Sequence, residues 1–437
     1  MGQGGGINLI NGTPYDWKKS NQTSYQVNWN FPDTIKSGTT ATIYIEWNQG
    51  LFVTETDTTA NVTYTLGTTA YRFDLQARRP NKAFVVQAYL ADIATDNNAR
   101  GDTINIGFIH DGDVYFILSG SGGNFTSSNM SKPWMQRNLG RLGRRALRDI
   151  CMPGTHNAGM STKTDGTALA SANNVLCQSV SVLGQLFAGS RYLDIRPVIG
   201  GEANEFFTGH YTNAGIVGWQ GWSGQSMKDI IGEINAFTAL CHELIIINLS
   251  HDFNKNAGFR SLYDDEWKRL FRDLTRLNNR YTAPNASTVI LSNLPLSSFI
   301  GANKAAVIIL VDPSLQVPLK AFPNRGFYAS SQLNVIDRYS NTIDPQHMIE
   351  TQITEMKNAP PSAFFLLSWT LTQASLRDVV LDDLMVIAEA VNMKLYTKLL
   401  PACSRTAFPN VIYIDFIKGA NRDIAALAMA VNSLFGP

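Results

Sequence analysis

The pattern of apolar and polar positions changes about a third of the way along the chain. Residues 1 to 125 hold short runs in which apolar and polar residues alternate, separated by Asp, Asn, Gly and Pro. Alternation is typical of strands with one buried face, and β-branched and aromatic residues favour the same structure. We therefore predict an N-terminal antiparallel β-sandwich. The expected strands lie at residues 24–29, 41–47, 61–66, 71–76, 83–89, 103–108 and 114–117.

Beyond residue 125, apolar runs of strand length alternate with longer amphipathic stretches. Strand and helix in repeated succession predict a parallel sheet, and eight such strands in about 300 residues predict a closed (β/α)8 TIM-type barrel. A Gly/Ser/Asn run at residues 119–132 is typical of a linker, which gives domains at 1–125 and 126–437. The expected barrel strands lie at 147–152, 190–196, 205–210, 244–250, 305–312, 333–338, 363–369 and 410–416, and the expected helices at 226–241, 262–277, 345–357, 378–399 and 421–435.

Composition narrows the choice of partners. The 437 residues are 44% hydrophobic and 16% charged, with a net charge of +1. Proteins that bind nucleic acid through its phosphates carry excess positive charge, so we expect no nucleic-acid partner. No run reaches the ~18 apolar residues of a membrane span, and no signal peptide is visible. Several Asn-x-Ser/Thr sequons keep secretion open, so the compartment stays unassigned. The four cysteines fit neither a disulfide framework nor a zinc motif, and we expect buried thiols.

Candidate chemistry gathers at the ends of the predicted strands, because a parallel barrel carries its active site at their C-terminal ends. Two histidines and an arginine beside carboxylates suit phosphoryl transfer. One imidazole accepts a proton from the attacking oxygen, the other protonates the leaving oxygen, and the guanidinium holds the phosphate. In a closed barrel the last strand adjoins the first, so Asp415 is expected to orient His156. The group comprises His156, Asn157, Asp194, Arg196, His210, Ser250, His251, Asp252, Asp312, Asp337, Tyr339, Trp369 and Asp415.

Three motifs within this group are more specific. They are the heptapeptide Pro-Gly-Thr-His-Asn-Ala-Gly at 153–159, the segment Gly-Ser-Arg-Tyr-Leu-Asp-Ile-Arg-Pro at 189–197, and Gly-His at 209–210. Together they resemble the X region of phosphatidylinositol-specific phospholipases C of the bacterial kind and their fungal relatives. The resemblance covers most of residues 140–420. It implies a phosphodiesterase that releases a cyclic inositol phosphate and diacylglycerol.

The resemblance also implies roles for individual residues. His156 would deprotonate the inositol 2-hydroxyl with Asp415 as its orienting partner, and His210 would protonate the leaving group. Arg196, assisted by Asp194, would hold the phosphate. Calcium-dependent relatives have a carboxylate where this chain has Arg196, so the resemblance implies a reaction without a cofactor.

Departures from the family pattern bear on the metal and on the substrate. Asn157 resembles the calcium-dependent branch, which keeps Ca²⁺ held by Asn157 and Asp194 as an alternative. Asp337-Arg338-Tyr339 resembles the Asp-x-Tyr segment of the bacterial enzymes, whose members hold the inositol ring. We expect the substrate to be bound by Asn157, Ser250, Asp337, Tyr339 and Trp369. Ser250 and Asp312 stand where those enzymes have Lys and Arg, so the head group stays open.

A phospholipid substrate requires contact with a membrane surface. Residues 211–224 form an uncharged, Gly-rich segment with two tryptophans, Trp219 and Trp222, and we expect these side chains either to enter the membrane interface or to wall the pocket. Two other functions remain open. A metal-dependent glycerophosphodiesterase or sphingomyelinase D-like enzyme would need a Glu-x-Asp pair, but the chain has Tyr192 and Asp194 there. A non-catalytic lipid- or glycan-binding protein would use the sandwich to bind and the barrel as a scaffold.

Overall fold

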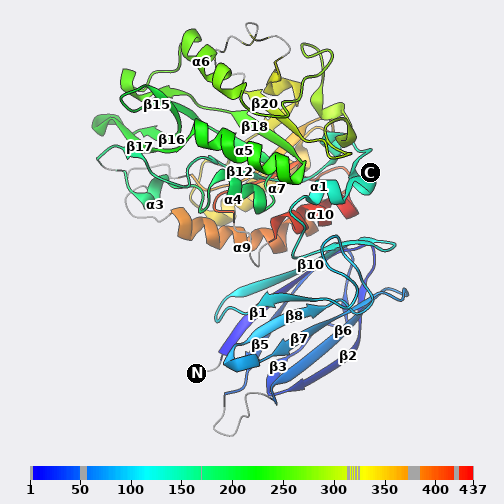
Figure 1. Ribbon diagram of the computed structural model, residues 1–437. Helices are drawn as coiled ribbons and strands as arrows, with labels where there is room; N and C mark the ends of the chain where they lie inside the picture. Colours follow the sequence, from blue (N-terminus) through cyan, green and yellow to red (C-terminus); the bar gives the residue numbers. More distant parts are fainter. Residues whose placement is uncertain are drawn as a thin grey trace. The chain divides into compact units, whose positions relative to one another are not determined.

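The computed structural model describes residues 3–49, 57–168, 170–312, 325–372, 384–417 and 423–436, together with residues 315, 317, 319 and 322. Contacts between residues divide the chain into two compact units (Figure 1). The first unit comprises Met1–Ser131 with Met393–Arg405 and Gly419–Pro437. The second comprises Lys132–Asn392 with Thr406–Lys418. Helix α9 (Leu384–Ala402) contributes residues to both.

The first unit is built from two sheets that share one hydrophobic core. Trp17 and Phe73 of one sheet lie with ring centroids 4.9 Å apart, and Phe116 of the other sheet lies 6.5 Å from Trp17. Six of the seven predicted strands are confirmed, but residues 24–29 are divided between the end of β2 and β3. The β-sandwich class stays a prediction. The six-stranded sheet has the order β4-β2-β6-β7-β8-β9 and the five-stranded sheet β11-β10-β1-β5-β3. The strands are β1 (Gln3–Gly12), β2 (Trp17–Tyr25), β3 (Val27–Trp29), β4 (Thr34–Ile35), β5 (Thr40–Trp47), β6 (Thr59–Leu66), β7 (Arg72–Arg78), β8 (Val85–Tyr89), β9 (Thr103–Gly107), β10 (Asp113–Ser121) and β11 (Asn124–Ser127).

Two further features of this unit differ from the sequence predictions. Strand β1 was not predicted, and it pairs in parallel with β10, so the unit is not antiparallel throughout. Its glycines suggest a loop, but they are needed for close packing: a Cβ at Gly5 would lie 2.4 Å from the Ile109 carbonyl oxygen. The predicted linker is also wrong, because most of it forms the β10–β11 hairpin, where Gly122 and Gly123 supply the positive φ of the turn.

The C-terminal helix of the chain belongs to the first unit. Helix α10 (Ile424–Leu434) packs against β1, β10 and β11, and the Asp423 side chain before it accepts a hydrogen bond from the Met130 backbone. Strand β10 is consequently buried on both faces. Phe116 lies in the core between the sheets, and Tyr115 and Ile117, which alternate with it, are buried as well.

The second unit contains a curled sheet of eight strands, all paired in parallel, in the order β21-β20-β18-β14-β12-β24-β23-β22. In the part of the chain that the structure describes, β21 and β22 are edge strands, so closure into a barrel stays a prediction. The strands are β12 (Met152–Thr155), β14 (Tyr192–Ile195), β18 (Leu244–Leu249), β20 (Ala306–Val311), β21 (Phe327–Ala329), β22 (Val335–Asp337), β23 (Phe364–Trp369) and β24 (Val411–Ile414).

The helices follow the predicted amphipathic stretches, and all five are confirmed within the described residues; positions 378–383 and 421–422 lie outside them. Apolar side chains of α5 (Met227–Cys241) and α6 (Asp264–Leu274), including Ile234 and Phe271, pack in one core with the sheet residues Ile247 and Ile309. None of the helices in the described ranges has the length and apolar character to cross a membrane. The helices of this unit outside α9 are α1 (Trp134–Arg137), α2 (Leu139–Leu142), α3 (Ala172–Val175), α4 (Val182–Phe187), α5 (Met227–Cys241), α6 (Asp264–Leu274) and α7 (Pro345–Asn358).

Two predicted barrel strands differ from the structure: residues 147–149 form a 3₁₀-helix ahead of β12, and another predicted strand belongs to a different sheet. Residues 205–210 lie in β16 (Glu205–Asn213), which pairs antiparallel with β15 (Pro197–Gly200) and β17 (Trp219–Ser226). The connection at 201–204 is too short for the crossover that a parallel pair needs, so the chain turns back as a hairpin. Strand β21, which was not predicted, is the eighth strand of the parallel sheet. This second sheet is completed by β13 (Asp165–Gly166) and β19 (Phe253–Asn254).

Candidate active site

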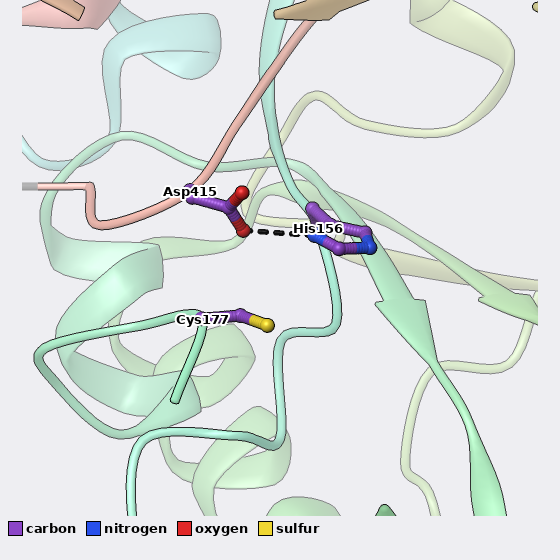
Figure 2. A group of neighbouring side chains, drawn as sticks. All are labelled: His156, Cys177 and Asp415. Atoms are coloured by element: carbon purple, nitrogen blue, oxygen red, sulfur yellow. Dashed lines mark hydrogen bonds and ion pairs between the residues drawn. The ribbon is translucent and has the colours of Figure 1, made fainter. Parts of the chain in front are cut away.

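The first pair of site residues lies at the ends of two neighbouring strands. His156 follows β12 and Asp415 follows β24, and these strands pair in parallel. His156 Nδ1 lies 2.8 Å from Asp415 Oδ1, and the dashed line in Figure 2 marks this hydrogen bond. Asp415 is 1% exposed, and a buried carboxylate beside Nδ1 selects the tautomer in which Nδ1 carries the proton. Nε2 of His156 then keeps its lone pair. The pairing of Asp415 with His156 that the strand order predicted is present.

Arg196 lies on the other side of the same imidazole. Its Nη2 is 2.7 Å from His156 Nε2, and its Nε donates to Asp194 Oδ2 over 3.1 Å. Burial alone lowers the pKa of Arg196, but Asp194 outweighs burial and raises that pKa, so the guanidinium stays charged. Burial alone raises the pKa of Asp194, but Arg196 and His156 hold it well below its usual range. The result is a fixed ion pair in contact with His156.

Asp194 is held by further donors. Its Oδ2 also accepts from the Asn157 backbone N–H over 3.0 Å, and its Oδ1 accepts from the Ser250 hydroxyl. Asn157 is fully buried with a left-handed backbone, φ 41°, a conformation that asparagine tolerates better than most residues. His251 Nδ1 lies 3.2 Å from the Ser250 Oγ. The structure thus brings Asn157 and Ser250 to the group through Asp194.

His210 enters the site from β16, outside the parallel sheet. Its Nδ1 lies 3.1 Å from the Val175 carbonyl oxygen and 3.6 Å from Cys177 Sγ. The carbonyl accepts only if Nδ1 carries the proton, which leaves Nε2 with its lone pair in the neutral ring. Burial, followed by the charges of Arg196 and His156, lowers the pKa of His210 to about 3. Without a substrate, His210 is therefore a neutral imidazole near neutral pH.

Two residues of the site were not among the predicted ones. Cys177 is fully buried beside His156 and Asp415, and the possible ligand atoms of the three all lie within 4.8 Å of one another (Figure 2). The Gln178 side chain donates to the His156 and Ile414 carbonyl oxygens over 2.9 and 3.2 Å, and so ties β12 to β24. Both residues lie between α3 and α4, in a segment without a motif or a periodic pattern that would have singled them out.

The remaining predicted substrate-binding residues form no hydrogen bond with this group in the described part of the chain. Trp369 is 0% exposed, and its indole N–H donates to the Val391 carbonyl oxygen over 3.0 Å. Tyr339 is 63% exposed. Asp337 ends β22, and desolvation, followed by the negative charge of Asp194, raises its pKa to about 6. Of these three, Asp337 is the one that is electrostatically coupled to Asp194.

Comparison with known proteins identifies the fold. No family model and no curated protein matches the sequence. Among solved structures, a phosphatidylinositol-specific phospholipase C from Staphylococcus aureus, studied for modulation of its membrane binding, matches with a TM-score of 0.50 and 15% identity over 70% of this chain and 98% of that one. The phosphatidylinositol-specific phospholipase C of Listeria monocytogenes matches with a TM-score of 0.46 and 17% identity over 66% of this chain and 95% of that one. The S. aureus match shows that this chain contains the fold of that enzyme.

Proposed function

We propose that the chain is a phosphodiesterase that cleaves a phospholipid of the phosphatidylinositol type. A neighbouring hydroxyl of the head group attacks phosphorus, the bond to the diacylglycerol oxygen breaks, and the products are a cyclic phosphate and diacylglycerol. The observation that carries this proposal is the continuous chain of hydrogen bonds from Asp415 through His156 to Arg196, which joins a buried carboxylate, a base and a phosphate-binding cation.

His156 is the proposed general base. Asp415 holds the Nδ1 proton, so Nε2 is the basic nitrogen. Without substrate, Arg196 donates to this nitrogen. A phosphate anion competes for the guanidinium, because two parallel charge-assisted hydrogen bonds are stronger than one hydrogen bond to a neutral imidazole. Binding of the phosphate therefore frees Nε2 to accept the proton of the attacking hydroxyl.

His210 is the proposed general acid. Its Nδ1 is used by the Val175 carbonyl, which leaves Nε2 for the leaving oxygen. Burial is the main cause of its low pKa, and the positive charge of Arg196 contributes. A bound phosphodiester brings negative charge next to Arg196 and opposes that effect, so the pKa of His210 rises in the substrate complex.

No cofactor is proposed, because Arg196 supplies the positive charge beside the phosphate. The alternative, Ca²⁺ between Asn157 and Asp194, would compete with the hydrogen bonds that Arg196, Ser250 and the Asn157 N–H donate to the Asp194 carboxylate. The glycerophosphodiesterase alternative lacks half of its metal pair, as Tyr192 occupies the first position.

The decisive experiment offers the full chain vesicles that contain phosphatidylinositol, phosphatidylcholine or phosphatidylethanolamine, with and without a chelator. Phosphorus NMR distinguishes a cyclic phosphate from a monoester. We expect a cyclic phosphate from the inositol lipid at an unchanged rate in chelator. Absence of phosphodiester cleavage on all three lipids would favour the non-catalytic alternative, and loss of activity in chelator would favour the calcium site.

Replacing Arg196 with lysine is expected to lower turnover by about 10²-fold or more, because an ammonium cannot reproduce the planar fork that holds two phosphate oxygens. Steady-state kinetics alongside thermal melting measures this. Arg338, an exposed arginine paired with Glu355, offers the matched control Arg338→Lys, which should leave turnover unchanged. Full recovery of Arg196→Lys on addition of Ca²⁺ would show that the position serves a metal.

The proposed membrane contact centres on the tip of the β16–β17 hairpin. Trp219 and Trp222, which we expected either to enter the membrane or to wall the pocket, are both half-buried. Trp219 stacks on Phe259 at 5.3 Å, and Trp222 lies under the Lys163 ammonium at 4.7 Å. Ile216 at the tip is fully exposed, and residues 206–227 hold no Asp, Glu, Lys or Arg. An exposed apolar tip without charge suits a lipid interface.

Ile216→Asp is therefore expected to weaken binding to lipid vesicles by about 10-fold or more, the equivalent of losing one buried aliphatic side chain. Activity on a short, soluble analogue should be retained. Vesicle sedimentation measures the binding. Leu240→Asp provides the control, as Leu240 is an exposed leucine on α5. Equal losses on soluble and vesicular substrate would assign Ile216 to the catalytic pocket.

A further inference from the structure

Cys177 has no part in the proposed reaction, yet it lies beside the proposed base. Three segments bring together three side chains: His156 after β12, Cys177 between α3 and α4, and Asp415 after β24. Their nitrogen, sulfur and oxygen atoms all lie within 4.8 Å of one another. We propose that these three residues form a binding site for a thiophilic divalent cation such as Zn²⁺, and that the bound cation inhibits the enzyme. The inhibition rests on the proposed function, whereas the binding does not.

The three side chains match the ligand preferences of zinc. Zn²⁺ binds thiolate, imidazole and carboxylate groups, and sites with three protein ligands are common. Asp415 and Cys177 are buried, and His156 is 18% exposed on its side chain, so one side of the site remains open to an entering ion. His210 Nδ1, 3.6 Å from the Cys177 sulfur, is a fourth donor nearby.

Asp415 provides independent support for a ligand. Its Oδ1 pairs with His156, but within the described ranges its Oδ2 is buried without a hydrogen-bond partner. A carboxylate oxygen that is removed from water and left unpaired costs free energy. A cation bound next to Oδ2 would offset that cost. Native proteins rarely leave such an atom unsatisfied unless it has a function or a missing ligand.

Charge and proton balance allow the binding. The cation displaces the Cys177 thiol proton to solvent, so the dication is neutralised by one thiolate and one carboxylate. If the cation takes the Nδ1 lone pair of His156, the imidazole proton moves from Nδ1 to Nε2. Arg196 is the nearby positive charge, and its pairing with Asp194 reduces the repulsion that the cation meets.

Inhibition follows from this change of tautomer. The proposed base needs a lone pair on Nε2 of His156, and that nitrogen carries a proton once the cation occupies Nδ1. The metal-bound imidazole cannot accept the proton of the attacking hydroxyl. The hydrogen bond that Arg196 donates to Nε2 is lost at the same time, because both nitrogens then carry a proton.

The experiment compares the full chain with Cys177→Ser, Cys177→Ala and the control Cys241→Ser, a buried thiol on α5 outside the group. Zn²⁺ is titrated against turnover, and each variant is referred to its own activity without metal. Loss of even an indirect partner of a metal site costs about 10–100-fold in affinity, so loss of the thiolate is expected to cost at least about 100-fold. Cys241→Ser should match the unaltered chain.

A second measurement is independent of activity. Co²⁺ bound to a thiolate gives a sulfur-to-metal charge-transfer absorption, which we expect in the unaltered chain and not in Cys177→Ser or Cys177→Ala. Equal zinc sensitivity of all variants, or absence of the thiolate band, would overturn the site. A thiolate band with undiminished turnover would overturn the inhibition alone. A band in a chain that cleaves no lipid would uphold the site and refute the proposed function.

Discussion

His156→Ala is expected to lower turnover on a phosphatidylinositol substrate by about 10²–10⁴-fold or more while the chain still folds cooperatively. The His156 imidazole links the Asp415 carboxylate to Arg196. Alanine removes the nitrogen that is proposed to accept the proton of the attacking hydroxyl. Asp415→Asn should also be severe, because an amide at that position no longer requires a proton on Nδ1 of His156.

Steady-state kinetics with thermal melting separates loss of chemistry from loss of folding. His210→Ala is expected to act as strongly, and the double variant should be little worse than either single one, since the two imidazoles serve one reaction. His347→Ala is the matched control, as His347 is an exposed histidine on α7. Near-parental turnover of either single variant on the true substrate would refute the acid–base roles.

Glu243→Gln is expected to lower the free energy of unfolding by about 3–5 kcal/mol, because it leaves a buried guanidinium without its counter-ion. Arg191 and Glu243 are both 0% exposed and meet at 2.8 Å between Nε and Oε2. The carboxylate also accepts from the backbone of Met135 and Gln136. The pair joins the residue before β14 to the residue before β18, at the end of the sheet opposite to His156.

Urea unfolding measures the change, and Glu355→Gln provides the control with the same chemical substitution. Glu355 pairs with Arg338 on the surface, where such pairs contribute about 0–1 kcal/mol. A loss below about 1 kcal/mol for Glu243→Gln would show that the Arg191 charge finds compensation elsewhere. Because the pair is remote from the proposed base, turnover of the folded variant should be retained.

The strand-end rule predicted the central group because it depends on topology alone. His156, Asp194 and Asp415 come directly at the ends of strands that pair within one parallel sheet, so their proximity follows from strand order. His210 was included on a wrong premise. It lies on an antiparallel strand, and tertiary packing rather than sheet order brings it to the site.

The features that the sequence did not predict are those that depend on tertiary contacts and leave no pattern in the local sequence. Cys177 and Gln178 occupy a loop without periodicity, and only the folded chain places them beside β12 and β24. Strand β21 is too short to show an alternation. Strand β1 contains glycines that suggest a loop, because the sequence does not reveal how closely its neighbours pack.

The place of α10 has a consequence for the synthesis of the protein. Strands β1 to β11 are translated before α10, which packs against β1, β10 and β11 and follows about 300 residues later, after roughly 15–60 s. Throughout that interval the nascent chain displays an apolar sheet face that water contacts. Such a surface is a substrate for chaperones and a starting point for aggregation. The unit that holds β1 to β11 therefore becomes complete only after the whole second unit and α10 have been translated.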